Sequence, residues 1–214
     1  MTQGDEADPE TVGEVLDGRA LRWQEHNAAR RADLVDACLR AVRAHGAGVS
    51  MDAIATVAET SKTVIYRHFT DRAGLYRAVA EKVGRRIEQA LQGVMAGDVV
   101  SRATLGAVID AYLALMEADP EVYRFVVRPP ALEGLVAERE VFSITDRAAR
   151  MLAGWLDTAV GGQRSRVWSV AIVGAVHACA DRWLAEPEPL DRAVLVEELV
   201  VLTWGGLGPV AAGG

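Results

Sequence analysis

Long uncharged hydrophobic runs are absent from this chain of 214 residues. No stretch reaches the roughly 18 apolar residues that a membrane-spanning helix requires, so we expect no membrane segment. The N-terminal stretch TQGDEADPE is acidic and has no apolar centre, which argues against a secretory signal. These absences predict a cytoplasmic protein.

Cysteine and clustered histidine are also scarce. Cys38 and Cys179 are far apart in sequence, and each falls on an apolar helix face. We therefore expect small buried hydrophobic side chains in a reducing compartment, with no disulfide. The histidines at positions 26, 45, 68 and 177 do not share the spacing of metal ligands, so no metal and no cofactor are expected.

Enzyme signatures are missing as well. The sequence contains no GxGxxG after a strand, no P-loop, no HExxH and no GxSxG. Carboxylates such as Glu197 and Glu198 fall on predicted helix surfaces, where solvation is their ordinary role. We expect no enzymatic activity.

Excess positive charge is confined to one segment. The chain carries a formal net charge of −7, but residues 28–88 hold eleven Lys or Arg against seven acids. The flanking segments are both acidic. A solvated helix face could produce such an excess, so its meaning depends on what else the segment contains.

The same segment contains two short amphipathic helices in succession, within residues 50–69. Ser50 is placed to cap the first helix, and Ser61 the second. Val64, Ile65 and Phe69 are available for burial. This pattern predicts a helix-turn-helix, whose second helix presents polar side chains to the major groove. Those side chains are Lys62, Thr63, Tyr66, Arg67 and His68.

The combination of Ser-x4-Tyr-x2-Phe, preceded by Ile-Ala-x2-Ala and followed by Thr-Asp-Arg-x2-Leu, resembles the DNA-binding domain of the TetR family of transcriptional regulators. The resemblance covers about residues 30–85. It implies base contacts from Lys62, Thr63 and Arg67. It implies phosphate contacts from Ser50, Tyr66, His68 and Arg72.

Two positions depart from the family pattern. Glu59 occupies the turn where the family usually has Gly, so it must adopt a left-handed conformation or a different turn. Val64 replaces a common Thr, which removes a hydroxyl that could meet a phosphate.

The start of the chain leaves two interpretations open. Residues 1–26 are expected to be an acidic, largely disordered extension, and Asn27 to begin a helix that ends at His45. Arg19, Arg22, Arg30 and Arg31 then form either a solvated helix start or a basic arm that reaches the minor groove.

The remaining patterns predict an all-α protein in which a helix-turn-helix domain (27–72) is joined by a long helix to a helical C-terminal domain (73–204), followed by a flexible tail (205–214). The resemblance implies that the C-terminal domain binds a ligand and forms the dimer. Residues 164–185 and 190–204 form two strongly apolar helices. Burial within one subunit is one explanation, and a two-fold four-helix interface between homodimer subunits is the other.

The resemblance also implies a small-molecule pocket in the C-terminal domain. The apolar and aromatic candidates, with one histidine that interrupts an apolar helix, favour a mostly hydrophobic ligand. They are Tyr112, Met116, Phe125, Phe142, Met151, Trp155, Trp168 and His177.

The function implied is a ligand-responsive regulator, usually a repressor released from a pseudo-palindromic DNA operator. The competing hypothesis is an all-α small-molecule-binding or enzymatic protein that keeps the helix-turn-helix only as scaffold.

Overall fold

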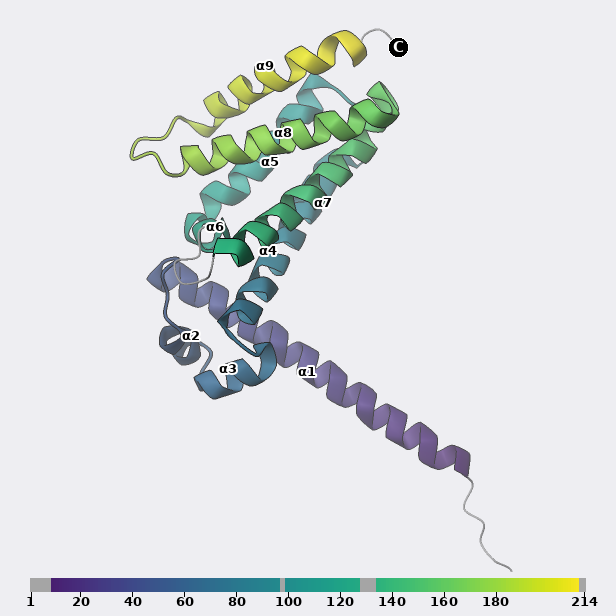
Figure 1. The fold of residues 1–214 in the computed structure, drawn as a ribbon, viewed down its shortest axis with the longest axis vertical. Coiled ribbons are helices and arrows are strands. Elements are labelled where there is room, and N and C mark those ends of the chain that lie inside the picture. The colour runs from purple at the N-terminus through teal and green to yellow at the C-terminus, as the bar shows by residue number, and fades with distance from the viewer. Residues whose placement is uncertain (1–8, 97–98, 128–133, 212–214) are drawn as a thin grey trace, which may run out of the picture.

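The computed structural model describes residues 9–96, 99–127 and 134–211. Within these ranges the chain forms nine α-helices and no strand, which confirms the all-α prediction (Figure 1). None of these helices is long and apolar enough to span a membrane. The helices are α1 (Pro9–His45), α2 (Met51–Val57), α3 (Lys62–Phe69), α4 (Arg72–Met95), α5 (Arg102–Ala118), α6 (Pro120–Val127), α7 (Gly134–Val160), α8 (Gly162–Trp183) and α9 (Arg192–Ala211).

Side-chain caps fix the starts of four helices. Ser50, Ser61, Asp71 and Ser101 each accept a hydrogen bond from the backbone N–H three residues further along the chain. Such a bond satisfies one of the donors that a helix start leaves without a partner. The two serine caps of the helix-turn-helix are therefore confirmed.

Two hydrophobic cores lie at opposite ends of α4. The N-terminal core joins α1, α2 and α3 to the first half of α4, through residues such as Leu34, Ile65 and Tyr76. The C-terminal core joins the second half of α4 to α5, α7, α8 and α9, through residues such as Leu105 and Leu156. Figure 1 shows α4 passing from one group of helices to the other. Val83 packs against both cores.

Two predicted boundaries require correction. α1 begins at Pro9, so residues 9–26 are helical, and Asn27 is an interior residue of the helix. A proline is well tolerated at a helix start, and no other proline follows before residue 120 to interrupt the pattern. α9 continues to Ala211, so residues 205–211 of the predicted tail are helical.

Glu59 lies in the left-handed region, with φ of 49°. The Thr60 N–H donates to the carbonyl of Ala55, and the Glu59 N–H donates to that of Thr56, at 3.0 and 3.1 Å. This pair of bonds is the Schellman motif, in which Gly is the favoured residue at the left-handed position. The turn therefore keeps its geometry, and Glu59 bears a conformational cost.

Candidate nucleic-acid interface and effector cavity

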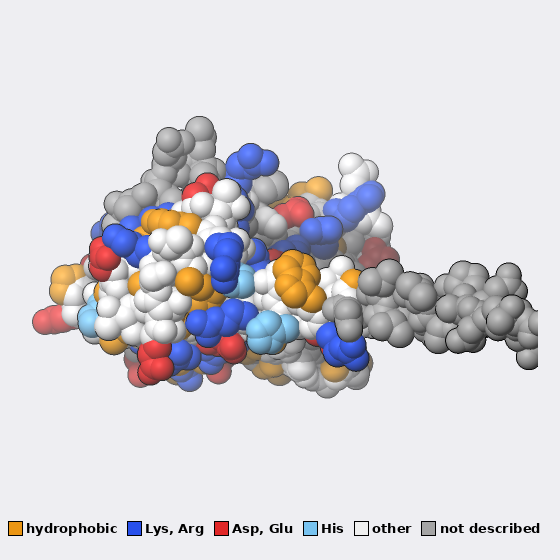
Figure 2. Space-filling view, turned by 90° about the horizontal axis from the view of Figure 1, so that it is seen from below, with side chains coloured by type: hydrophobic (Ala, Val, Ile, Leu, Met, Phe, Trp, Pro, Cys, Tyr) orange, Lys and Arg blue, Asp and Glu red, His pale blue; other side chains and the backbone are white. Residues whose placement is uncertain are grey.

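α3 has one buried side and one exposed side. Ile65 and Phe69 are buried in the N-terminal core, so the helix is held from beneath. Lys62, Thr63, Tyr66 and Arg67 are exposed on the other side. Seen from below, Lys, Arg and His side chains gather on this end of the molecule (Figure 2). Exposed donors on a rigidly held helix are what a reader of base edges and phosphates requires.

Lys62 has a partner that the sequence analysis missed. Its ammonium lies 2.9 Å from the Asp52 carboxylate on α2. The hydrogen bond and charge of Asp52 raise the pKa of Lys62. Because both groups are exposed, the pair is readily exchanged for another anion such as a phosphate.

Three predicted phosphate contacts also have structural roles within the protein. Ser50 caps α2 through its hydroxyl. The Arg72 guanidinium donates to the carbonyl of Val49 at 3.2 Å, which ties the start of α4 to the segment before α2. The backbone carbonyl of His68 accepts a hydrogen bond of 2.5 Å from Arg31 on α1.

Gly74 allows α3 and α4 to meet. A Cβ atom at this position would lie 1.9 Å from the carbonyl oxygen of Phe69. Between the two helices, Thr70 has a positive φ of 70°, and the Asp71 N–H donates to the Phe69 carbonyl at 2.8 Å. This tight turn fixes the direction of α3 relative to α4.

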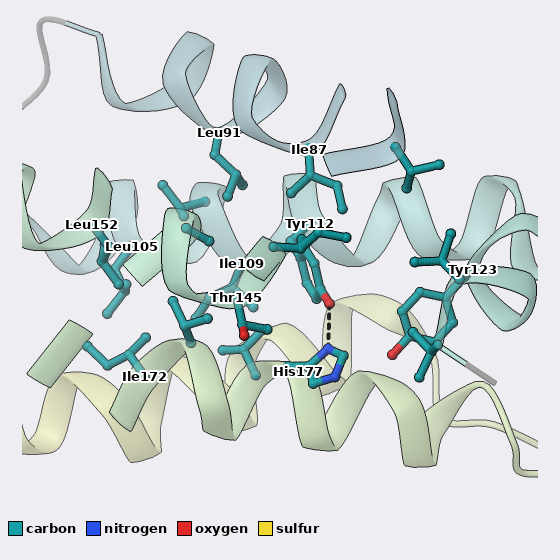
Figure 3. A pocket seen from close by; sticks show the side chains of 18 residues that line it. Ile87, Leu91, Leu105, Ile109, Tyr112, Tyr123, Thr145, Leu152, Ile172 and His177 are labelled. Atoms are coloured by element: carbon teal, nitrogen blue, oxygen red, sulfur yellow. Dashed lines mark hydrogen bonds between the residues drawn. The ribbon is translucent and has the colours of Figure 1, made fainter. Parts of the chain in front are cut away.

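A cavity of about 70 Å³ lies within the C-terminal core (Figure 3). Helices α4, α5, α6, α7 and α8 all contribute to its wall. The lining is almost entirely aliphatic or aromatic: Val83, Ile87, Leu91, Leu105, Val108, Ile109, Tyr112, Tyr123, Val126, Val127, Ile144, Thr145, Ala148, Leu152, Ile172, Val173, Val176 and His177.

The cavity has a polar end. The Tyr112 hydroxyl lies 3.1 Å from Nδ1 of His177, and the ring of Tyr123 meets the His177 ring edge-on at 6.4 Å. In Figure 3 these three residues lie together, whereas Leu105, Leu152 and Ile172 lie toward the other end. Burial lowers the pKa of His177, an effect that the charge of Asp181 opposes in part, and burial raises the pKa of Tyr112. Both groups are therefore neutral near pH 7.

The sequence profiles of two domains match this chain. Residues 34–79 match the profile described as bacterial regulatory proteins of the tetR family. Residues 86–213 match the profile described as the Tetracyclin repressor-like C-terminal domain. The second match alone covers more than half of the chain. The chain belongs to the TetR family of transcriptional regulators.

Individual TetR-family proteins are similar over most of their length. An uncharacterised HTH-type transcriptional regulator of Mycobacterium tuberculosis is 33% identical over 210 residues, which cover 92% of this chain and 86% of that protein. The transcriptional activator FasR of Mycolicibacterium smegmatis is 28% identical over 78% of this chain and 76% of its own. The structure of FadR from Bacillus subtilis, in complex with stearoyl-CoA, has a TM-score of 0.67 and 18% identity, and covers 82% of this chain and 98% of its own. These likenesses confirm a DNA-binding transcriptional regulator with the TetR fold.

The structure separates the predicted ligand-pocket residues into two groups. Tyr112 and His177 line the cavity. The side chain of Phe142 lies outside the described residues. The other five do not line this cavity: Met116, Phe125, Met151, Trp155 and Trp168.

Packing elsewhere accounts for these five positions. Phe125 is buried in the N-terminal core, with its ring 5.8 Å from that of Tyr76. Trp168 carries the Arg164 guanidinium 5.7 Å from its ring centre. Met116 is buried in the C-terminal core, and Met151 and Trp155 pack against that core. Helical periodicity shows that a side chain faces inward, but not whether it meets a neighbour or a void.

Proposed function

We propose that this TetR-family protein is a homodimeric repressor that binds a pseudo-palindromic operator and is released by a small, mostly hydrophobic molecule. The observation that carries the proposal is the path of α4. Gly74 at its start holds the recognition helix, while Val83, Ile87 and Leu91 further along line the cavity. A ligand that displaces these three side chains acts on the element that aims α3.

α6 provides a second connection between the cavity and the DNA-binding domain. Tyr123, Val126 and Val127 on one part of this helix line the cavity. Glu121, at its start, accepts a hydrogen bond of 2.9 Å from the Ala47 N–H, just beyond α1. Asp119, immediately before α6, pairs with Arg43 on α1 at 2.6 Å.

Tyr76 strengthens this connection. It donates a hydrogen bond to the carbonyl of Val126 from within the N-terminal core. A shift of α6 therefore reaches both α1 and α4. Two packed elements that contact both sites are the physical basis for coupling ligand binding to DNA binding.

The cavity predicts the chemistry of the ligand. Its aliphatic wall suits a hydrocarbon portion, and the Tyr112–His177 pair suits one neutral polar group at the end. FadR, whose structure holds stearoyl-CoA, is similar in fold and supports an apolar-chain ligand for this chain. About 70 Å³ holds a few water molecules, so any larger ligand must move the lining helices apart. That movement is the signal in the proposed mechanism.

Exposed apolar side chains on α8 and α9 support the dimer. Along α8 they recur at spacings of three or four, and so share one face: Val167, Val170, Ala171, Gly174 and Ala178. On α9, Val194, Val201 and Leu202 are exposed, whereas Leu195 and Leu199 are buried in the subunit's own core. Leu202 is 67% exposed and Val170 62%. Burial within one subunit therefore does not account for these faces, and a second copy would cover them.

The test of DNA reading begins with a duplex selected by the full-length protein from a random-sequence pool. We expect Lys62→Ala combined with Arg67→Ala to lose preference for that duplex over unselected DNA by at least about 100-fold, since each base contact contributes about 1–3 kcal/mol. Circular dichroism should show an unchanged fold. The control, Arg85→Ala with Arg150→Ala, removes two exposed positive charges elsewhere and should keep the preference. Equal preference in both variants would favour the scaffold hypothesis.

The test of release uses stearoyl-CoA as the probe, added to the complex with the selected duplex. Repression relieved by ligand predicts weaker DNA binding as the probe concentration rises. Tighter binding would contradict release by this probe. An unchanged affinity, with calorimetry showing no bound probe, would exclude this long-chain thioester as the ligand.

A further inference from the structure

In the N-terminal half of α1, the described side chains lie outside both hydrophobic cores. α1 runs away from the body of the subunit beyond the helix-turn-helix (Figure 1). The side chains of residues 20–26 are all exposed, and Trp23 is 68% exposed. An exposed helix segment gains little stability from packing within the subunit. Its exposed side chains are therefore available to bind another molecule.

The charges on this part of α1 are divided between two faces. At 100° per residue, Arg22, Trp23, His26 and Arg30 fall within an arc of about 100° on one side of the helix. Glu25, with Gln24 and Ala28, lies on the other side. Arg22 and Arg30 belong to the group for which the sequence left open a solvated helix start or a basic arm that reaches the minor groove.

Arg31 lies about 100° further round α1 than Arg30, outside the basic face, and packs against α3. Arg31 donates to the carbonyl of His68 at 2.5 Å, and its guanidinium lies 4.3 Å from the centre of the Phe69 ring. Arg30 is close enough to His68 for its charge to act on that imidazole. After burial and Arg67, it contributes to lowering the pKa of His68. The Arg30 edge of the basic face thus lies beside the end of α3 that carries Arg67 and His68.

We propose that the face formed by Arg22, Trp23, His26 and Arg30 binds the sugar-phosphate backbone of duplex DNA just outside the half-site that α3 reads. This inference rests on the proposed DNA-reading role of α3. Charge complementarity and continuity with the α3 surface identify the occupant. Arg31 is fixed against α3, and Arg22 lies nine residues before it, about 14 Å along the helix axis. That distance corresponds to about four base pairs of flanking duplex.

The experiment compares Arg22→Gln with Arg30→Gln against a matched control on the same helix. The control, Gln24→Glu with Ala28→Glu, changes the net charge by the same amount on the opposite face. The probe is the selected duplex with ten or more base pairs of flanking sequence on each side, and the readouts are hydroxyl-radical footprinting and the salt dependence of binding.

In the arginine variant we expect protection of the flanking backbone to disappear, while protection within the half-sites remains. The slope of log K against log salt should fall by about three to four, because a dimer loses four phosphate contacts. Affinity should fall by about tenfold at moderate salt. The control should keep the flanking footprint.

An unchanged footprint and slope in the arginine variant would overturn the inference. So would loss of the dimer in gel filtration by this variant, which would assign the face to the second subunit. If the unmodified protein selects no sequence from the pool, the proposed DNA-reading role of α3 fails instead, and the two failures are thereby distinguished.

Discussion

The N-terminal core is filled around α3 and borders a groove along α1, whereas the C-terminal core encloses a cavity. In the first, side chains from α1, α2, α3 and the start of α4 fill the interior, and Leu34, Ile65, Leu75 and Tyr76 are almost wholly buried. In the second, α4, α5, α6, α7 and α8 leave about 70 Å³ unfilled beside Tyr112 and His177. A filled core suits the DNA-binding domain (α1 to α3), which must hold one geometry. An unfilled core suits the C-terminal domain, whose helices separate in the proposed mechanism.

The largest effect should come from the contact between α3 and α4 that orients the recognition helix. We expect Gly74→Ala to displace α3, since the new methyl group would meet the Phe69 carbonyl at 1.9 Å. The cost should be about 3 kcal/mol, with binding to the selected duplex reduced by at least about 100-fold. Thermal denaturation and DNA titration measure the two effects.

Gly93 on the same helix is the matched control, because a Cβ there meets nothing within 4 Å. Gly93→Ala should leave DNA binding unchanged and stabilise the protein by about 0.5–1 kcal/mol. Similar behaviour in both variants would show that the contact at Gly74 does not position α3.

Adding the same side chain to each core tests the comparison itself. Ala80 is fully buried in the N-terminal core, so Ala80→Leu should destabilise the protein by about 1–3 kcal/mol. Ala148 lines the cavity, so Ala148→Leu should be stabilising by about 1 kcal/mol as it fills the void. Chemical denaturation measures both, and destabilisation of equal size in the two variants would contradict the distinction between the cores.

The polar end of the cavity should give a pH dependence. Burial lowers the pKa of His177 in the folded protein, so the unfolded chain binds a proton more readily. The stability from the neutral imidazole is present above about pH 6.5 and is lost as pH falls through the lowered pKa. His177→Gln should therefore flatten the decline of Tm between about pH 7.5 and 5.5, by about 1–2 °C.

Tyr112→Phe is the comparison for this experiment, because it removes the hydroxyl partner and keeps the imidazole. Its Tm should still decline with falling pH. If the Tm of the His177→Gln variant declines with falling pH as steeply as that of the unmodified protein, His177 is not the titrating group.

The smallest effect should come from the turn of the helix-turn-helix. Glu59 has a φ of 49° where glycine is favoured, so Glu59→Gly should stabilise the reader by about 0.5–1 kcal/mol. Tm should rise by about 1–4 °C. A lower Tm would mean that the Glu59 side chain makes a stabilising interaction.

The helices and caps of the DNA-binding domain could be predicted closely from the sequence, because they depend on local chemistry. Capping serines, the buried positions Ile65 and Phe69, and the Thr-Asp-Arg turn specify their own surroundings over a few residues. The partner of Lys62 was missed because Asp52 comes from the preceding helix, and only the angle between α2 and α3 brings the two together.

The C-terminal domain could be predicted only in outline. Its helices follow from apolar periodicity, but the cavity exists where five helices fail to fill a common space. Tyr112 and His177 border that space, whereas Phe125 reaches across to Tyr76 in the other core. The role of α6 in linking the two cores depends on tertiary contacts such as that of Ala47 with Glu121, which no local pattern announces.

The most direct test of the account is the distance between the two recognition helices in a dimer bound to the selected duplex. Thr63→Cys provides an exposed site for a spin label, with Cys179→Ser removing the more accessible natural thiol. Burial raises the pKa of the Cys38 thiol to about 12, so that residue should not react. After allowance for the label, the account predicts about 34–36 Å between the helix centres, which matches successive major grooves. A spacing that fits no whole turn of DNA, or a monomer on the duplex, would contradict it.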